Sequence, residues 1–204
     1  MTNGTKLAPL AFAWPYALVF WLVCLWAYYP EFRILREAKR SLRNAPAGTG
    51  DPSYRPLVLG QQIVLFVAVL TAFLAPGLAM RAGRTMIFAV GVLTIIAGGL
   101  LRRHCFRMLG SDFRGAVTVR NDQPVVERGA YRFLRHPSYA AALLLHLGFA
   151  LAFTNWGTLA VIILGAPPLF MYRIRVEERA LASRIGAPYV AYMSRTKRLV
   201  PGVW

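Results

Sequence analysis

Five runs of apolar residues set the strongest limit on what this chain can fold into. They cover residues 10–29, 57–78, 85–101, 139–153 and 157–172. A helix of about 20 apolar residues crosses the hydrocarbon core of a bilayer, and the longer runs reach that length. Hydrophobic residues make up 57% of the chain, above the roughly 45–50% usual for soluble domains, and the surplus lies in these runs. We therefore predict an all-α integral membrane protein with about five transmembrane helices.

The last two runs predict a short helical hairpin over residues 139–172. Only residues 154–156 separate the two runs, so their helices should be tight antiparallel neighbours. Pro167 and Pro168 lie within the second run. We expect them to break that helix at a place where protein or a cavity covers the freed backbone.

The first three runs define an N-terminal membrane region, residues 1–101. Its third run contains Gly91, Gly98 and Gly99, which allow a neighbouring helix to approach closely. Between the first and second runs, residues 31–44 place apolar side chains at helical spacing and arginines on the other faces. This pattern predicts a basic helix lying on anionic headgroups. A plain extension of the first helix into the cytoplasm is an equal alternative.

The distribution of positive charge predicts how the chain sits in the membrane. There are 24 Lys+Arg against 8 Asp+Glu, a net charge of +16. If the five runs alternate across the membrane, 21 of the 24 basic residues fall in segments 30–56, 102–138 and 173–204. The positive-inside rule then places these segments in the cytoplasm and the N-terminus outside. Because membrane topology accounts for this charge, we expect no nucleic-acid partner.

The two cysteines indicate neither a disulfide nor a metal site. Cys24 lies inside an apolar run and Cys105 in a basic segment, and neither has a companion at Cys-x-x-Cys spacing. His104 precedes Cys105, but a single such pair is poor evidence for a metal. We expect no metal site.

Two polar segments adjoin the open end of the predicted hairpin. Residues 123–139 lead into the fourth run, and residues 173–178 follow the fifth. Because the open ends of a hairpin are neighbours, His136 should lie close to Glu177 and Glu178. A cluster of ionisable groups at a membrane boundary indicates a functional site.

The motifs in these segments resemble those of a known family. The first is Arg135-His136-Pro137-Ser138-Tyr139, directly before the apolar hairpin. The second comprises Glu177-Glu178, Leu181, Gly186, Tyr189, Tyr192 and the terminal Arg198-Leu199-Val200-Pro201. Over residues 115–204 the chain is similar to the isoprenylcysteine carboxyl methyltransferase family, within a wider group that includes phospholipid N-methyltransferases and thiol S-methyltransferases.

The resemblance implies a catalytic region, residues 102–204, with a cytoplasmic pocket that binds S-adenosylmethionine and releases S-adenosylhomocysteine. No Gly-x-Gly-x-x-Gly follows a predicted strand, which agrees with a cofactor site outside a Rossmann domain. The family's cofactor-binding residues correspond to Gln123, Val125, Val126, Gly129, Tyr131, Arg135, His136, Pro137, Tyr139 and Glu178. Gln123 departs from the histidine often found there. Arg173 and Glu177 correspond to the polar pair facing the methyl acceptor, which makes them the candidate catalytic residues.

The chemistry of methyl transfer leaves three classes of acceptor open. A carboxylate is ionised at neutral pH and needs no general base, and the planar guanidinium of Arg173 suits it as an anchor. An amine would need a base, for which Glu177 or His136 would have to serve. A thiol would need its pKa lowered, which nearby arginines would do.

Several of these residues have simpler interpretations when taken alone. Arg173 and Glu177, at positions i and i+4, would make a surface ion pair of the kind that contributes little to stability. His136 would cap the entry of the fourth run, and Tyr139 would be an interfacial anchor. His146, seven residues after Tyr139, is expected to be a helix-packing group.

We predict an enzyme that transfers a methyl group to a lipid-type acceptor entering from the bilayer, most naturally a carboxylate such as that of a prenylcysteine. The alternatives are N-methylation of a phospholipid, S-methylation of a small thiol, and a non-catalytic membrane scaffold with the same fold.

Overall fold

The structure, a computed structural model, describes residues 7–43, 53–110 and 124–200. Over these residues the regular structure is helical and contains no β-strand. The long helices are α1 (Tyr16–Arg43), α2 (Tyr54–Leu74), α3 (Arg84–Leu109), α4 (Pro137–Ala152) and α5 (Trp156–Ile185), followed by the short α6 (Ala187–Arg195). Each predicted apolar run therefore contributes one long helix, and the all-α prediction is confirmed.

The helices have the length and surface of a membrane protein. Among the described residues, α2, α3 and α5 are each long and apolar enough to cross a membrane, whereas α4 and the apolar part of α1 are shorter. Large apolar side chains such as Phe66, Met86 and Leu164 are exposed on the outer faces of these three helices. Water would penalise such a surface, and lipid would not. The chain is an integral membrane protein, and the count of five spans stays a prediction.

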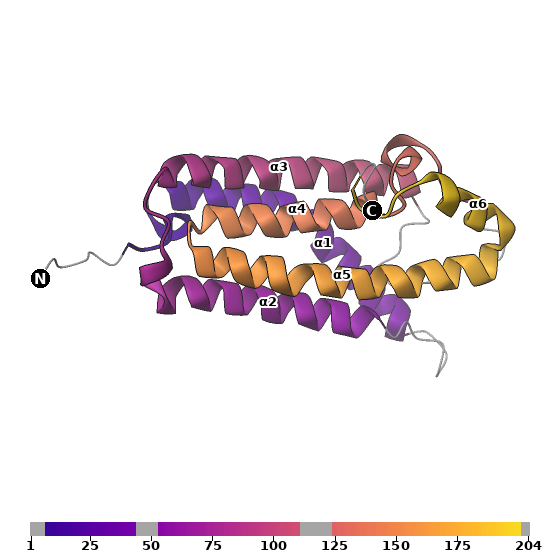
Figure 1. Cartoon of the computed structure of the whole chain (residues 1–204), viewed down its shortest axis with the longest axis horizontal. Helices are drawn as coiled ribbons and strands as arrows, with labels where there is room; N and C mark the ends of the chain where they lie inside the picture. The colour runs from indigo at the N-terminus through magenta and orange to yellow at the C-terminus, as the bar shows by residue number, and fades with distance from the viewer. Residues whose placement is uncertain (1–6, 44–52, 111–123, 201–204) are drawn as a thin grey trace, which may run out of the picture.

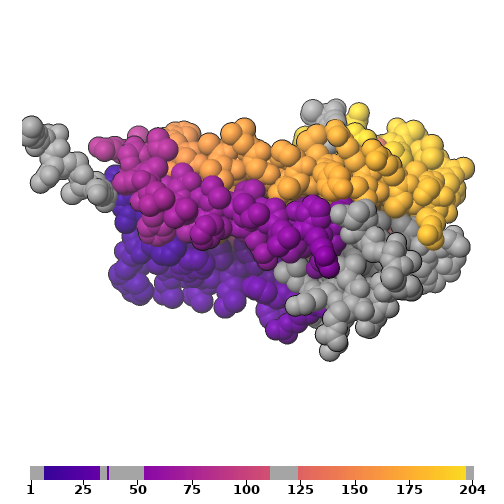
Figure 2. Space-filling view, turned by 90° about the horizontal axis from the view of Figure 1, so that it is seen from below, coloured from indigo at the N-terminus to yellow at the C-terminus, as the bar shows by residue number. Residues whose placement is uncertain are grey.

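The helices form one bundle with a defined order of neighbours. Four helices, α2 to α5, run along the long axis of the molecule, and α1 passes obliquely behind them (Figure 1). The most extensive contacts join α3 to α4 and α2 to α5. Figure 2 shows α2 between α1 and α5 on one face of the bundle. The expected boundary between residues 101 and 102 falls inside α3, and the division into two regions stays a prediction.

Backbone-to-backbone packing sets the distance between α3 and α4, as the glycines of the third run predicted. A Cβ built on Gly91 would lie 2.5 Å from the backbone nitrogen of Ala152, and one on Gly148 would lie 2.6 Å from the carbonyl oxygen of Gly91. Gly98 likewise faces the backbone of α4. Small residues allow this approach in membranes, where close packing takes over the role of the hydrophobic effect.

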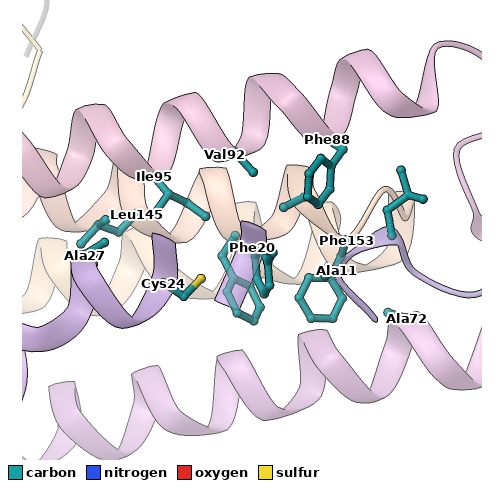
Figure 3. Close-up of a cluster of buried hydrophobic side chains, with 13 residues drawn as sticks. Ala11, Phe20, Cys24, Ala27, Ala72, Phe88, Val92, Ile95, Leu145 and Phe153 are labelled. Carbon is teal, nitrogen blue, oxygen red and sulfur yellow. The ribbon is translucent and has the colours of Figure 1, made fainter. Parts of the chain in front are cut away.

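An aromatic cluster fixes the turn between α4 and α5, at the end of the bundle far from α6. The ring of Phe153 lies 4.7 Å from that of Phe149 and 5.8 Å from that of Phe20 on α1. Phe88 of α3 and Ala11 of the short helix η1 (Leu10–Phe12) belong to the same cluster (Figure 3). Because the turn of the α4–α5 hairpin lies at this end, the open ends of the hairpin lie together at the other end, beside α6.

The structure changes one expectation about helix ends and leaves another untested. Pro167 and Pro168 do not break the fifth helix, because α5 continues through both of them to Ile185. The fixed φ of proline is itself helical, and membrane helices tolerate the lost hydrogen bonds where neighbouring groups satisfy the freed carbonyls. The helix α1 continues through Pro30 to Arg43. Whether the basic segment 31–44 lies on anionic headgroups or extends into the cytoplasm stays a prediction.

The contact between α3 and α4 predicts a loss of stability for Gly148→Ala. The added methyl group would meet backbone atoms of α3 that cannot rotate away, so the helices have to separate at a cost of about 1–3 kcal/mol. Thermal unfolding of the purified protein in detergent measures the effect. Gly77→Ala is the matched control, because a Cβ there would have nothing within 4 Å. Equal unfolding temperatures for the two variants would contradict the proposed packing.

Candidate active site

The two polar segments predicted to meet at the open end of the hairpin do meet. The Nε2 atom of His136 lies 3.4 Å from Oε1 of Glu178, and the hydroxyl of Tyr139 donates to Oε2 of Glu177 over 2.6 Å. His136 immediately precedes α4, whereas the two glutamates lie in the polar part of α5 that follows the apolar run. The hairpin thus brings together side chains that are 42 and 38 residues apart in the sequence.

The carboxylate of Glu178 holds together three cationic or polar side chains. Arg135 donates to it from Nε over 2.8 Å, and Arg198 donates from Nε over 3.0 Å. Burial raises the pKa of Glu178, but the hydrogen bonds from His136 and Arg198 and the charge of Arg135 outweigh burial and lower the pKa to about 2. The carboxylate is therefore ionised at neutral pH and fixes the segment that leads into α4.

The chain after α6 closes over the same segment through its backbone. The backbone nitrogens of Arg135 and His136 donate to the carbonyl oxygens of Lys197 and Arg198 over 2.7 and 3.0 Å. The hydroxyl of Tyr192 donates to the carbonyl oxygen of Tyr131 over 2.8 Å. These bonds give the loop before α4 a fixed shape even though it contains little regular structure.

Arg173 is buried and held from two sides. Its side chain is among the most fully buried in the described part of the chain, with 2% of the residue exposed. The guanidinium donates from Nε to the hydroxyl of Tyr139 over 3.1 Å and from Nη1 to Oγ of Ser53 over 2.6 Å. Because Tyr139 in turn donates to Glu177, the hydroxyl joins the two candidate catalytic residues. Arg173 and Glu177 are therefore not a surface ion pair.

A cavity of about 320 Å³ lies between the helices at this end of the bundle, within the size range of small-molecule sites. Most of the predicted site residues line it: Val125, Val126, Tyr131, Arg135, His136, Tyr139, Arg173 and Glu177. Leu57, Val58, Leu145 and Phe170 form an apolar wall of the same cavity. The cavity therefore has a polar end beside α6 and an apolar part that continues between the membrane helices.

The other predicted residues contribute differently. Gly129 begins the short helix η4 (Gly129–Arg132) with φ +61°, and a Cβ there would lie 2.6 Å from Nε2 of His104, so glycine allows the loop to pack on α3. Pro137 is the first residue of α4, where a proline costs no helical hydrogen bond. Glu178 lies behind the residues that line the cavity, and Gln123 lies outside the described residues.

One ion pair on the cavity wall was not predicted. Arg102 of α3 is buried and binds Glu31 of α1 through two of its three guanidinium nitrogens, at 2.5 Å (Nε) and 2.9 Å (Nη2). Its Nη1 donates to the carbonyl oxygen and to the hydroxyl of Ser138 in the first turn of α4. All three residues line the cavity. The signal in the sequence was an acid directly after the first apolar run and a base directly after the third, on the same predicted side of the membrane.

Comparisons with known proteins agree with these motifs. Residues 89–183 match the model of the isoprenylcysteine carboxyl methyltransferase (ICMT) family. The chain is 30% identical over 115 residues to protein-S-isoprenylcysteine O-methyltransferase B of Arabidopsis thaliana, over 55% of this chain and 58% of that protein. It is 30% identical over 114 residues to the protein-S-isoprenylcysteine O-methyltransferase of Saccharomyces cerevisiae, over 55% of this chain and 48% of that protein. The chain thus spans about half the length of these curated relatives.

A solved structure shares the fold. The eukaryotic intramembrane Ras methyltransferase ICMT superimposes with a TM-score of 0.63 at 20% identity, over 95% of this chain and 70% of that chain. At this identity the likeness supports the fold alone, and it extends to nearly all of the helices described above. The family match covers α4 and nearly all of α5, which bear Tyr139, Arg173 and Glu177. Over residues 89–183, this chain is therefore similar to the isoprenylcysteine carboxyl methyltransferase family.

Proposed function

We propose that this protein is an S-adenosylmethionine-dependent methyltransferase that methylates a carboxylate on a lipid-type acceptor, such as the α-carboxyl of a prenylcysteine. One observation carries the proposal. A buried arginine, Arg173, lines a cavity that the predicted cofactor residues also line. The curated relatives are named as methyltransferases of isoprenylcysteine, and their names support the same class of acceptor.

The polar end of the cavity fits S-adenosylmethionine. Val125 and Val126 offer an apolar surface for a planar base, and Arg135 and His136 offer donors and a polar edge. The carboxylate of Glu177 lies in the same cavity and suits a cationic group. When bound, S-adenosylmethionine supplies a methyl group made electrophilic by its sulfonium. Glu178 would act from behind this wall, by fixing Arg135 and His136 rather than by lining the cavity.

Arg173 is placed to bind and aim the acceptor. Its bonds to Tyr139 and Ser53 hold the guanidinium in one position, which reduces the entropy lost when an anion is oriented. A planar guanidinium is also suited to a carboxylate, whose two oxygens it binds side by side. The arrangement supports catalysis by positioning, since a carboxylate nucleophile has no proton to lose.

An amine acceptor fits this site less well. The two candidate bases are already engaged, because Glu177 accepts a hydrogen bond from the hydroxyl of Tyr139 and His136 faces the ionised Glu178. An amine would therefore have to displace an existing bond before it could be deprotonated. The geometry supports the carboxylate over phospholipid N-methylation for this reason.

The acceptor would enter from the bilayer and the cofactor from the cytoplasm. The apolar part of the cavity, with Leu57, Leu145 and Phe170, suits a hydrocarbon body. The positive-inside count supports a cytoplasmic C-terminus, and segments 123–139 and 173–204 are on that predicted side. The basic residues of 31–44 would attract anionic lipids to the same face.

Methyl transfer with a labelled donor tests the proposed function directly. The purified protein in lipid vesicles should transfer label from the methyl group of S-adenosylmethionine to a prenylcysteine with a free carboxyl group. The product should release its label in alkali, because a methyl ester hydrolyses there. A prenylcysteine whose carboxyl is blocked as an amide is the control and should stay unlabelled. Base-stable label would indicate an amine or thiol acceptor, and no transfer to membrane lipids or prenylcysteine would support the scaffold.

Arg173→Ala should lower kcat/KM for the acceptor about 100-fold, roughly 2.7 kcal/mol, the size of a lost charge-assisted hydrogen bond. Calorimetry should show that affinity for S-adenosylhomocysteine is retained within a few fold. Arg175→Ala, at an exposed position of the same helix, is the matched control and should keep full activity. Unchanged turnover in Arg173→Ala would remove the anchoring role.

Reporter fusions test the orientation. A fluorescent protein fused after Trp204 should fluoresce, and alkaline phosphatase at the same position should be inactive, because both results mark the cytoplasm. The matched fusion is placed after Asn155, in the turn between the last two spans, and should give the opposite pair of results. Active phosphatase after Trp204 would overturn both the orientation and the cytoplasmic site.

A further inference from the structure

Two residues that line the cavity each carry a buried polar atom without a hydrogen-bond partner. Over the described residues, the buried side-chain atoms without a partner are the hydroxyl of Tyr28, on α1, and Nε2 of His146, on α4. Both side chains line the cavity described above. A buried polar atom without a partner is costly, so native structures rarely keep one without a reason. Two of them on the wall of one cavity point to a ligand that supplies the missing bonds.

The chemistry of His146 fixes what that ligand has to offer. Its Nδ1 lies 2.7 Å from the carbonyl oxygen of Ala142 on the same helix. A carbonyl oxygen can only accept, so Nδ1 carries the proton, and in a neutral imidazole Nε2 is then an acceptor. The exposed fraction of His146 is 3%, and its ring packs edge-on against that of Phe170 with the ring centroids 5.9 Å apart. The partner of Nε2 therefore has to be a hydrogen-bond donor.

The position of His146 separates this pair from the Arg173 end of the cavity. Tyr139, which contacts Arg173, and His146 are both on α4. Their separation of seven residues corresponds to about 10 Å along a helix axis. Between them, Ala142 and Phe170 keep the cavity wall apolar. His146 thus lies about 10 Å farther along α4 than Tyr139, which contacts the proposed carboxylate anchor Arg173.

We propose that the deep end of the cavity recognises a hydroxyl group on the methyl acceptor. The hydroxyl donates to Nε2 of His146, and the hydroxyl of Tyr28 makes a second bond to the same polar part of the ligand. A neutral hydroxyl supplies the donor that Nε2 of His146 lacks and adds no further charge to the cavity. This inference rests on the proposed function and narrows it. The acceptor is an amphiphile with a carboxylate at one end and a hydroxyl about 10 Å away, rather than a plain hydrocarbon chain.

Binding of matched acids to the full-length protein in detergent tests this, without any methyl donor. The probes are straight-chain carboxylic acids of eight to twelve carbons and their ω-hydroxy counterparts of the same length. At one chain length the hydroxy acid should bind about tenfold more tightly, the scale of one hydrogen bond. His146→Leu should remove this preference while the plain acid still binds, and His146→Gln should restore part of it through its amide oxygen.

Tyr28→Phe removes one hydroxyl and should reduce the preference severalfold. Tyr29→Phe is its matched control, because the neighbouring Tyr29 is 61% exposed on the outside of α1, and it should leave the preference unchanged. Equal affinity for the two acids at every chain length, no measurable binding of any of them, or a preference that survives His146→Leu would overturn the inference. Equal affinity for the two acids is also the result expected if a water molecule bridges the hydroxyl of Tyr28 and Nε2 of His146.

Methyl transfer is measured separately on the same acids, so that the two proposals fail in different ways. A hydroxyl preference in binding without any methyl transfer would remove the proposed function and leave the recognition of the hydroxyl. Transfer to plain and hydroxy acids at equal efficiency, with equal affinities, would keep the function and remove the recognition.

Discussion

Buried cations in a membrane bundle require anions, and this chain supplies few of them. It has 8 acidic residues against 24 basic ones. Three acids among the described residues organise the candidate site. Glu31 neutralises Arg102 and so ties the ends of α1 and α3 together, and Glu178 gathers Arg135 and Arg198. Glu177 accepts a hydrogen bond from the hydroxyl of Tyr139, which in turn accepts one from Arg173. Desolvated charges of this kind are tolerated only in such pairs, so the polar end of the bundle can assemble in few other ways.

The same constraint explains why one cavity has two different ends. Near α6 the walls carry charges that are fixed by partners behind them, such as Arg135 held by Glu178. Farther from α6, apolar side chains such as Leu145 and Phe170 line the cavity, and the unpartnered polar atoms, on Tyr28 and His146, belong to neutral side chains. A ligand that spans the cavity therefore changes its environment along its length. From the end near α6 inward, the ligand would contact charged side chains, then apolar side chains, and then the hydroxyl of Tyr28 and Nε2 of His146.

The sequence predicted the features that depend on neighbours along the chain. Run length gave the helices, and the three-residue connection gave the hairpin that brings His136 to Glu178. The prediction of a helix break at Pro167 and Pro168 was wrong. Whether the freed backbone carbonyls are covered depends on helices that are distant in the sequence. The sequence also missed the pair of Glu31 and Arg102, because pairing of distant helices requires knowledge of their relative rotation. The unsatisfied nitrogen of His146 was invisible for the same reason, since its helical spacing fits packing and ligand binding equally well.

The backbone contact between Gly91 and Gly148 has a mechanical consequence. The two glycines face backbone atoms of the opposite helix, so a change of side-chain rotamer cannot relieve that contact. The facing positions of α2 and α5 differ, because Gly60 lies against the flexible side chain of Leu169 and Gly165 against Val64. We expect α3 and α4 to move as one body when a bulky lipid passes, and α2 and α5 to yield. The bundle would then have a stiff half and a compliant half, and the route from the bilayer would open on the compliant one.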